Sequence, residues 1–411
     1  MNAPVMRRTT CRLCNSADLH KILFFGETPL ANAFRLPSDT SPEVFAPLVV
    51  NMCGRCKLVQ LRDVVDPSVL FRNYLYVSGT SVSFVAHFAA YAKSVAERFK
   101  LTNDSLVVDI GSNDGVLLSQ FKELGTKILG VDPAEDIATQ ASARGIPTVA
   151  AFFTSDVATE IEKTHGKASI ITANNVFAHT DDVMLFASTV RELLQEDGVF
   201  IFEVQYLKDL VEKNLFDIVY HEHLCYYHLM PLIPFFDKLG MRVFDVERVE
   251  THGGSIRVFV GHTSGPHERA ESVARMLESE KELGRVETYQ RFAKRIKENG
   301  TKLRALLTEL KKNGKRIVGY GAPAKATTLC YAFGIDSSLL DFIVDDSSLK
   351  QGRLMPGTHI PIRAANALYE ERPDYCLILA WNFAGEIMRA HEKFKASGGS
   401  FILPVPEVRI V

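Results

Sequence analysis

Two pairs of cysteines near the start of the chain constrain its fold more than any other feature. Each pair has the spacing C-x-x-C, and the four residues are Cys11, Cys14, Cys53 and Cys56. Two such knuckles can supply four thiolates in a tetrahedron, which is the arrangement that Zn²⁺ prefers at a closed structural site. Gly54 eases the tight turn of the second knuckle. Because four thiolates leave no open position on the metal, we predict a structural zinc and not a catalytic one.

The segment that holds these cysteines, residues 1–75, is predicted to be a small zinc-binding module. Its apolar stretches are short, and the span between the knuckles looks loop-like because it contains Pro29, Pro37, Pro42 and Pro47. A module with so small a core needs a metal for stability. Disulfides or free core cysteines are the alternative. The N-terminal residues do not resemble a secretory signal, so we expect a reducing, cytoplasmic location, which disfavours disulfides.

The composition of the 411 residues is that of an ordinary globular protein, with 46% hydrophobic and 23% charged residues. No apolar run is long enough to span a bilayer, so we expect no membrane partner. The formal net charge is −2, and residues 1–80 carry nine Lys/Arg against six Asp/Glu. This weak excess of basic residues does not indicate a nucleic-acid-binding surface, and we expect no nucleic-acid partner.

Two regions of alternating strands and helices follow the zinc-binding module. An amphipathic pattern over residues 82–100 predicts a helix, and the alternation after it predicts a parallel, doubly wound sheet. The first set of predicted strands is 106–110, 128–131, 169–173 and 199–204. Residues 268–313 are polar and favour a helical connection. A second set is predicted at 315–319, 340–345 and 375–380. We therefore expect an α/β protein with a module at 1–75 and domains at 76–284 and 285–411.

A glycine-rich turn follows the strand at 106–110 and has the pattern D-x-G-x-x-x-G. Its glycines let the backbone pass close to a ligand at the carboxyl edge of the sheet. An acid about twenty residues later is placed to bind ribose hydroxyls. This arrangement resembles the S-adenosylmethionine site of class I methyltransferases, although a plain tight turn in another doubly wound protein is the alternative. The predicted cofactor-binding residues are Asp109, Gly111, Asn113, Asp114, Gly115, Asp132, Pro133, Asn174 and Asn175.

The densest group of polar side chains lies at residues 220–228, in the sequence YHEHLCYYH. An extended conformation would place His221 and His223 on one side and Glu222 on the other. The zincin motif H-E-x-x-H is excluded, because Cys225 occupies its fifth position. Histidine can act as a general base on a carbon made acidic by an adjacent carbonyl. The alternatives are a second metal site formed by His221, His223, Cys225 and His228, and partly buried side chains without a catalytic role.

Seven motifs in a fixed order resemble those of the sugar C-methyltransferases of deoxysugar biosynthesis, and they cover essentially the whole chain. The motifs are the two zinc knuckles, Tyr74-x-Tyr76-x-Ser78, the turn Asp109–Gly115, Asn175-Val-Phe-Ala-His179, Tyr220-His-Glu-His223, His252-Gly-Gly-Ser255-x-Arg257 and Gly319-Tyr-Gly-Ala-Pro-Ala-Lys325. The resemblance implies an N-terminal zinc-binding domain, a central methyltransferase domain and a C-terminal α/β domain. It also implies C-methylation of a nucleotide-activated 4-keto-6-deoxy sugar. The nucleotide (dTDP or GDP) and the methylated carbon (C3 or C5) stay open.

The resemblance also implies roles for individual residues. His223 corresponds to the base that removes the proton beside the 4-keto group. Tyr220 and Glu222 would position the sugar or orient the imidazole, and His179 and Tyr76 would reach the substrate. The segment after Tyr76 lacks the second serine that the family leads us to expect, which weakens the expectation of a substrate contact from Ser78.

Two further motifs are candidates for binding an anion. His252, Ser255 and Arg257 combine a flexible turn with a cation that can pair bidentately. An ordinary turn into a strand at 256–260, with a surface arginine, is the alternative. The glycine-rich turn before Lys325 opens a predicted helix, which favours binding of the sugar nucleotide's pyrophosphate. Tight packing of strand on helix is the alternative there. Asp345-Asp346 and Trp381-Asn382 end later strands at the same edge.

Two other functions are consistent with parts of the sequence. A zinc-ribbon RNA methyltransferase also combines knuckles with such a turn, but it should present a basic face, which the charge does not indicate. A non-catalytic binding scaffold is the third alternative. The intact residues Asp109, Gly111, Asp132 and His223 argue against it.

Overall fold

The computed structural model describes residues 5–71 and 82–411, and its strands form four sheets within these residues. The first parts of the chain build two of them. Strand β1 (Val5–Arg7) pairs with β5 (Asp63–Val65). Strands β2 (Leu19–Pro29), β3 (Phe45–Cys53) and β4 (Val59–Leu61) form an antiparallel sheet, to which the much later β11 (Cys225–Tyr226) adds a fourth strand. The short helix α1 (Pro67–Phe71) follows.

The prediction that the span between the knuckles is loop-like is wrong for about half of its length. Strands β2 and β3 form a long hairpin. Residues 15–18 and the connection that contains Pro37 and Pro42 lack regular structure, apart from a single bridge at Arg35. Pro29 is the last residue of β2, and Pro47 pairs with Glu27 next to a register shift. Prolines at the ends and irregular points of strands do not break a ladder, so they did not exclude strands here.

The central sheet has seven strands in the order β12-β13-β10-β9-β6-β7-β8. The strands are β6 (Leu106–Ile110), β7 (Lys127–Asp132), β8 (Thr148–Ala150), β9 (Ala168–Asn174), β10 (Leu194–Gln205), β12 (Met241–Val249) and β13 (Ser255–His262). All four strands predicted for this region are present. The sheet is not parallel throughout, because β13 runs antiparallel to both β10 and β12.

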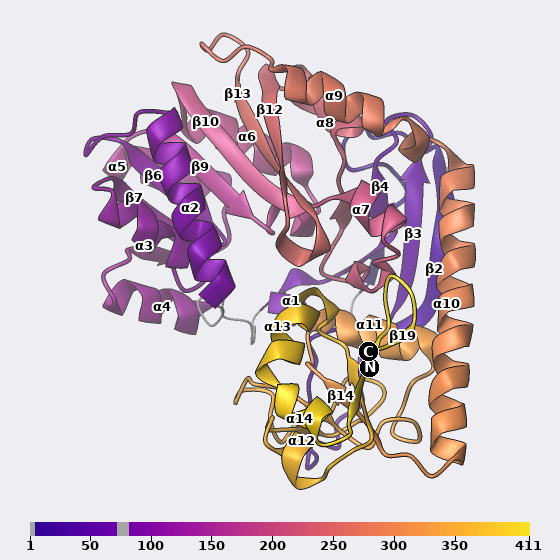
Figure 1. The fold of residues 1–411 in the computed structure, drawn as a ribbon. Helices are drawn as coiled ribbons and strands as arrows, with labels where there is room; N and C mark the ends of the chain where they lie inside the picture. Colours follow the sequence, from indigo (N-terminus) through magenta and orange to yellow (C-terminus); the bar gives the residue numbers. More distant parts are fainter. Residues whose placement is uncertain (1–4, 72–81) are drawn as a thin grey trace.

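Helices cover both faces of the central sheet (Figure 1), and neighbouring residues of one strand enter different cores. Val107 packs with α2 on one face, whereas Val108 packs with α6 and α8 on the other. The helices of this region are α2 (Val82–Arg98), α3 (Val116–Glu123), α4 (Glu135–Ala143), α5 (Ser155–His165), α6 (Val183–Leu193), α7 (Leu207–Glu212), α8 (Leu229–Lys238) and α9 (Glu271–Ser279). Burial of both faces explains the nearly continuous apolar runs in these strands.

The C-terminal sheet has six strands in the order β16-β15-β14-β17-β18-β19, and its last strand is antiparallel. The strands are β14 (Ile317–Tyr320), β15 (Ile343–Val344), β16 (Ile362–Arg363), β17 (Tyr375–Ile378), β18 (Ser400–Leu403) and β19 (Arg409–Ile410). The helices are α11 (Ala324–Phe333), α12 (Ala367–Glu370), α13 (Ala384–Ala390) and α14 (Glu392–Ala396). The predicted Rossmann-like α/β arrangement of this region is confirmed.

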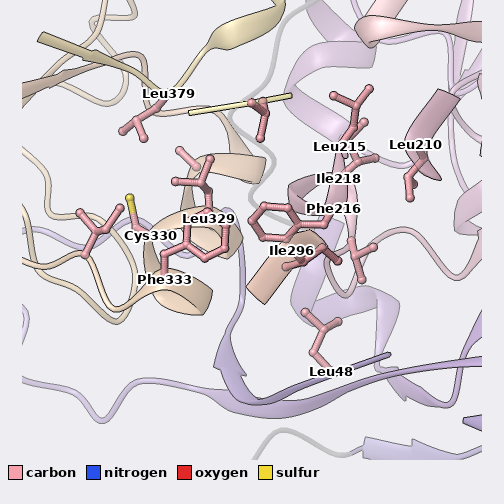
Figure 2. Packing of buried hydrophobic residues seen from close by; sticks show 14 of the residues in the cluster. Leu48, Leu210, Leu215, Phe216, Ile218, Ile296, Leu329, Cys330, Phe333 and Leu379 are labelled. Atoms are coloured by element: carbon pink, nitrogen blue, oxygen red, sulfur yellow. The ribbon is translucent and has the colours of Figure 1, made fainter. Parts of the chain in front are cut away.

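The long helix α10 (Val286–Lys312) runs along the side of the molecule beside β2 and α11 (Figure 1). It helps to enclose one hydrophobic core that is shared by distant parts of the chain. Figure 2 shows Leu48 of β3, Phe216, Ile296 of α10 and Phe333 of α11 in this core. The rings of Phe216 and Phe333 lie 4.7 Å apart. The zinc-binding module is therefore packed against the C-terminal region and does not stand alone.

Among residues 5–71 and 82–411, no helix combines the length and apolar character that crossing a membrane requires.

Candidate active site

The four predicted zinc ligands lie together, and their sulfur atoms are all within 4.8 Å of one another. Cys11 Sγ is 3.4 Å from Cys56 Sγ, and Cys14 Sγ is 3.6 Å from Cys53 Sγ. A tetrahedron with Zn–S bonds of about 2.3 Å has edges of about 3.8 Å, so the donors fit a closed zinc site. The described residues form no second cluster of this kind, so the alternative of a metal at His221, His223, Cys225 and His228 is not supported.

A single cavity of about 1080 Å³ runs between the carboxyl edges of the central and C-terminal sheets. One end, where the cofactor was predicted to bind and which we call the cofactor end, is lined by Asp109, Gly111, Ser112, Asn113, Asp132, Pro133, Phe152, Phe153, Asn174 and Asn175. Its middle includes Asn32, His179, Asp181, Ile218, Tyr220, His223 and His252. Its C-terminal end includes Tyr320, Gly321, Lys325, Asp345, Asp346, Lys350 and Asn382. Loops after parallel strands supply both ends of the cavity. The β2–β3 connection, which holds Asn32, and the segments between β10 and β13 complete its middle.

The cofactor end is built around the turn after β6. Gly111 has a φ of +69°, and a Cβ added to it would lie 2.3 Å from Val176, so no other residue fits. The Asp132 carboxylate accepts the backbone N–H of Asn113 at 2.8 Å and that of Ala134 at 2.9 Å. Asp109 accepts a hydrogen bond of 2.6 Å from Thr172, and burial raises the pKa of Asp109 to about 7.

Two predicted cofactor residues do not line the cavity. Asp114 and Gly115 lie at the back of the turn, where Gly115 precedes the first residue of α3 with a φ of +77°. Phe152 and Phe153, which follow β8, line the cavity and were not predicted. An aromatic pair after the third parallel strand was their signal in the sequence, but the short strand before it was not recognised.

The C-terminal end repeats the hydrogen bonds of the cofactor end. Gly111 N–H donates to the carbonyl of Val131 at 2.7 Å, and Gly321 N–H donates to that of Val344 at 2.7 Å. Each acceptor precedes an aspartate, Asp132 or Asp345.

Asp345 also repeats the contacts of Asp132, because it accepts N–H groups from the turn and from the residue two positions after itself. These donors are Ala322 at 2.7 Å and Ser347 at 2.8 Å. Both ends of the cavity therefore have the backbone geometry that suits a nucleoside or phosphate ligand.

Lys325 lies in the wall of the C-terminal end. Its ammonium group is 3.4 Å from the centre of the Trp381 ring and donates to Asn382. The Trp381 indole donates to Asp217 at 2.6 Å. Desolvation lowers the pKa of Lys325, and the carboxylate of Asp217 opposes this shift.

Residues 220–223 form a turn and not an extended segment, since His223 N–H donates to the carbonyl of Tyr220 at 3.0 Å. The expectation that His221 and His223 face the same side is therefore wrong. His221 lies away from the cavity with Nε2 3.1 Å from the carbonyl of Ala46, whereas His223 lines the cavity.

The Nδ1 atom of His223 is 2.7 Å from the carbonyl of Ile218. A carbonyl can only accept, so Nδ1 carries the proton and Nε2 keeps its lone pair. The ring centre of Tyr220 is 4.0 Å from that of His223, and the ring centre of His179 is 5.2 Å away. Burial, with a smaller effect of His179, holds the pKa of His223 well below its usual value. His223 is consequently neutral at pH 7.

Glu222 is buried beside the cavity without lining it. One of its oxygens accepts a hydrogen bond of 2.7 Å from Asn32, which does line the cavity, and burial raises the pKa of Glu222 to about 7.

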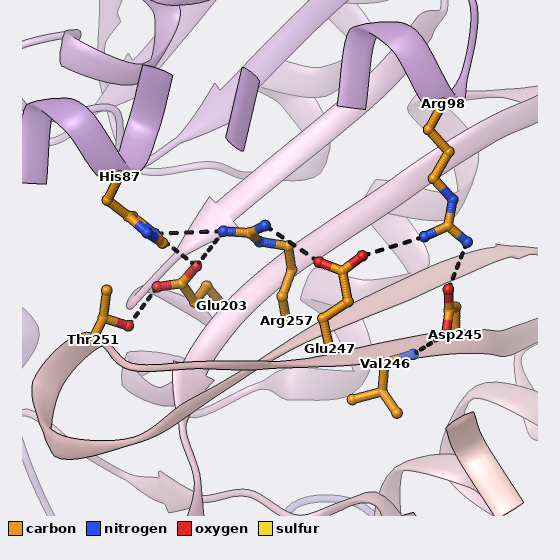
Figure 3. A network of polar contacts seen from close by, with 8 residues as sticks. All are labelled: His87, Arg98, Glu203, Asp245, Val246, Glu247, Thr251 and Arg257. Atoms are coloured by element: carbon orange, nitrogen blue, oxygen red, sulfur yellow. Dashed lines mark hydrogen bonds and ion pairs between the residues drawn. The ribbon is translucent and has the colours of Figure 1, made fainter. Parts of the chain in front are cut away.

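The motif at 252–257 divides between the cavity and the protein interior. His252 lines the cavity, but Ser255 and Arg257 do not. Figure 3 shows Arg257 within a buried network, where it pairs with Glu203 at 3.0 Å and with Glu247 at 3.4 Å. The structure thus gives Arg257 an internal partner in place of a ligand. Tyr76 and Ser78 lie outside the described residues.

Comparison with known proteins identifies the family. Family models match residues 11–71 ("Putative zinc binding domain"), 84–245 ("Methyltransferase domain") and 250–406 ("C-methyltransferase C-terminal domain"). The C-methyltransferase NovU of Streptomyces niveus is 40% identical over 404 residues, which cover 98% of this chain and 96% of NovU. The chain belongs to this C-methyltransferase family.

As a C-methyltransferase, the protein uses S-adenosylmethionine, and the predicted cofactor and structural zinc are confirmed. Solved structures resemble about half of the chain. Magnesium protoporphyrin IX methyltransferase from Synechocystis PCC 6803 is 14% identical, with a TM-score of 0.35 over 48% of this chain and 97% of that chain.

Proposed function

We propose that this C-methyltransferase methylates a nucleotide-activated 4-keto-6-deoxy sugar, linked to dTDP or GDP. The observation that carries the proposal is the position of a neutral histidine between two similar ligand-binding turns in one cavity. The cofactor would occupy the turn at Gly111, and the nucleotide would occupy the turn at Gly321. The sugar would then lie in the middle, beside His223. The relative NovU is named a C-methyltransferase, which agrees with a carbon acceptor.

His223 is the proposed base. A ketone at C4 acidifies the hydrogen on the neighbouring carbon, and Nε2 of His223 takes this proton while the electron pair moves onto the enolate oxygen. The hydrogen bond to Ile218 fixes the reactive tautomer. Bound S-adenosylmethionine supplies an electrophilic methyl group for the nucleophilic carbon. Tyr220, His179, Tyr76 and, through Asn32, Glu222 are proposed to position the sugar or the imidazole.

The C-terminal end of the cavity is proposed to hold the nucleotide. Its cations are Lys325 and Lys350, and an α-helix of ten residues, α11, begins beside the turn. A helix start and a lysine together suit a pyrophosphate. His252 is proposed to contact the substrate from the opposite wall. We place this nucleotide-binding part within a C-terminal domain at 285–411, after a zinc-binding module at 1–75 and a methyltransferase domain at 76–284.

The test is an exchange experiment in deuterated water. The protein is incubated with an enzymatically generated 4-keto-6-deoxy sugar nucleotide, with and without S-adenosylmethionine, and the sugar is examined by NMR and mass spectrometry. We expect deuterium on the carbon beside the ketone without the cofactor and one new C-methyl group with it. His223→Gln should abolish both, whereas the matched control His221→Gln should retain both. Absence of exchange and methylation with dTDP and GDP sugars alike would overturn the proposal.

A further inference from the structure

Arg12 lies between the zinc ligands Cys11 and Cys14, and its side chain is fully buried. It reaches from the knuckle to the cavity wall. Its Nε donates to Asp181 at 2.9 Å, and its Nη1 donates to the carbonyl of Leu61 at 2.6 Å. The backbone N–H of Arg12 donates to the side chain of Gln60 at 2.9 Å. A buried arginine with this set of contacts has a fixed position.

Asp181 is the other end of this link. Its second carboxylate oxygen accepts a hydrogen bond of 2.8 Å from Arg8, so two arginines hold the group from the side of the zinc-binding module. Asp181 lines the cavity and follows His179 by two residues, in the segment between β9 and α6. The ring of His179 lies beside that of His223. The position of Asp181 therefore constrains the short segment that carries His179.

Leu61 gives Arg12 a second route to the site. Leu61 is the last residue of β4, and β4 pairs with β11. Strand β11 begins directly after the segment that holds His223. The N–H of Leu61 donates to the carbonyl of Leu224 at 2.9 Å, while its carbonyl accepts from Arg12. One side chain in a zinc knuckle thus contacts the segment that carries His179 directly, and it reaches the segment that carries His223 through Leu61.

We propose that Arg12 is a positioning residue that transmits the geometry of the zinc knuckle to the segment 175–182. Zinc fixes Cys11 and Cys14, these fix Arg12, and Arg12 holds Asp181 and with it His179. The catalytic consequence rests on the proposed function, whereas the structural consequence does not.

The test uses three variants: Arg12→Lys, Asp181→Asn and the double variant that combines these two changes. Each is compared with a control variant, Arg98→Gln. The control removes an Arg–Asp pair of similar length, Arg98–Asp245 at 2.6 Å, which does not line the cavity. Amide hydrogen exchange is followed by mass spectrometry, since the N–H groups of Asn175 and His179 are hydrogen-bonded and report on the segment. Zinc content and melting temperature are measured in each variant.

We expect amide exchange in 175–182 to accelerate about tenfold in both single variants, with the double variant no faster than either, because a charge-assisted pair couples the two residues. Zinc content should match wild type, and Arg98→Gln should leave the segment unchanged. Zinc removal from wild type should accelerate the same amides. For methyl transfer, kcat should fall in the single variants while KM for S-adenosylmethionine stays near wild type.

Unchanged exchange in 175–182 in the variants, or after zinc removal, would overturn the proposal, as would additive effects in the double variant. If wild type methylates no 4-keto sugar, the proposed function fails, but the exchange data still decide the role of Arg12.

Discussion

His223 donates from Nδ1 to the Ile218 carbonyl, so Nε2 is the ring nitrogen that can accept a proton. Burial lowers the pKa of this imidazole, and His179 adds to the shift. A lowered pKa means that protonation, and with it loss of the base, occurs only at more acidic pH. The residue is thus available as a base throughout the neutral range.

This argument predicts the pH dependence of the reaction. The acidic limb of kcat/KM for the sugar nucleotide should lie below pH 6.5, the ordinary value for histidine. The measurement is a pH profile of methyl transfer at saturating S-adenosylmethionine. A limb centred above pH 7 would contradict the assignment of His223 as the base.

Asp217 offers a second test at this scale. Its Oδ2 accepts from Trp381, and its charge raises the pKa of Lys325 against desolvation. Asp217→Asn keeps an acceptor for Trp381 but removes the charge, so Lys325 should lose its proton more easily. Desolvation leaves the pKa of Lys325 at about 7 in wild type, so the variant should differ most just below that pH. We expect KM for the sugar nucleotide to rise about tenfold at pH 6.5 with little change in kcat, since a lost charge contact is worth about 1.4 kcal/mol. The rise should shrink at pH 8, where Lys325 is neutral in wild type as well as in the variant.

The exposed Glu212, changed to Gln, is the control for this variant. An equal rise in KM at both pH values would show that Asp217 acts by packing and not through the charge of Lys325.

At the scale of elements, α2 is joined to the central sheet by the buried network of Figure 3. His87 of α2 contacts Glu203 of β10 at 3.1 Å. The guanidinium carbon of Arg257 in β13 lies 3.7 Å from the ring centre of Tyr91, also in α2. Burial alone would raise the pKa of Glu203, but the bond from His87 and the charge of Arg257 outweigh it and lower the pKa to about 2.

Glu203→Gln should therefore destabilise the protein by about 3 kcal/mol at pH 7, because it leaves the buried Arg257 with only the longer, partly exposed pair to Glu247. A depressed acidic pKa stabilises the fold above the unfolded value of about 4.3, and this stabilisation is lost as pH falls toward 2. The difference in unfolding free energy between wild type and variant, measured in urea, should thus narrow between pH 5 and pH 3. A difference that does not depend on pH would contradict this account.

The sequence predicted elements best where one strong local signal was present. Strand β6 matches its predicted range, since five apolar or buried residues end at a glycine turn. The hairpin of β2 and β3 was missed because prolines at tolerated positions outweighed the apolar pattern. Residues 220–223 were misread because alternation of residue types does not reveal a turn that is held by the Ile218 carbonyl and by the N-terminal sheet.

The site was predictable where motif and fold agree. Gly111 and Asp132 line the cavity and the four cysteines lie together, as their spacing in the sequence leads one to expect. Arg257 has an internal role because Glu203 and Glu247 lie on neighbouring strands, and the sequence does not show which residues those strands bring together. Asn32 and Asp217 reach the site only through tertiary packing, so no local pattern marked them.

At the scale of the molecule, the zinc-binding module and the C-terminal region share one core, which contains Leu48 of β3 and Phe333 of α11. Loss of the metal should then destabilise the C-terminal region as well as the zinc-binding module. We expect chelation to lower the melting temperature of the whole chain in one transition, observed by calorimetry, because the shared core couples the parts.

Cys14→Ser should reproduce the effect of chelation without a chelator. A separate low-temperature transition, with the remaining protein melting at its original temperature, would show that the module unfolds independently.

The pairing of β4 with β11 has a consequence for how the chain is made. On the ribosome, β2, β3 and β4 emerge long before Cys225 and Tyr226, so the free edge of β4 has no partner while most of the central domain is synthesised. An uncovered strand edge can pair with another chain. Early capture of zinc would compact the nascent hairpin during this interval, and the edge is closed only when the segment that carries His223 arrives. The proposed base is therefore among the last groups to be set in place around the N-terminal sheet.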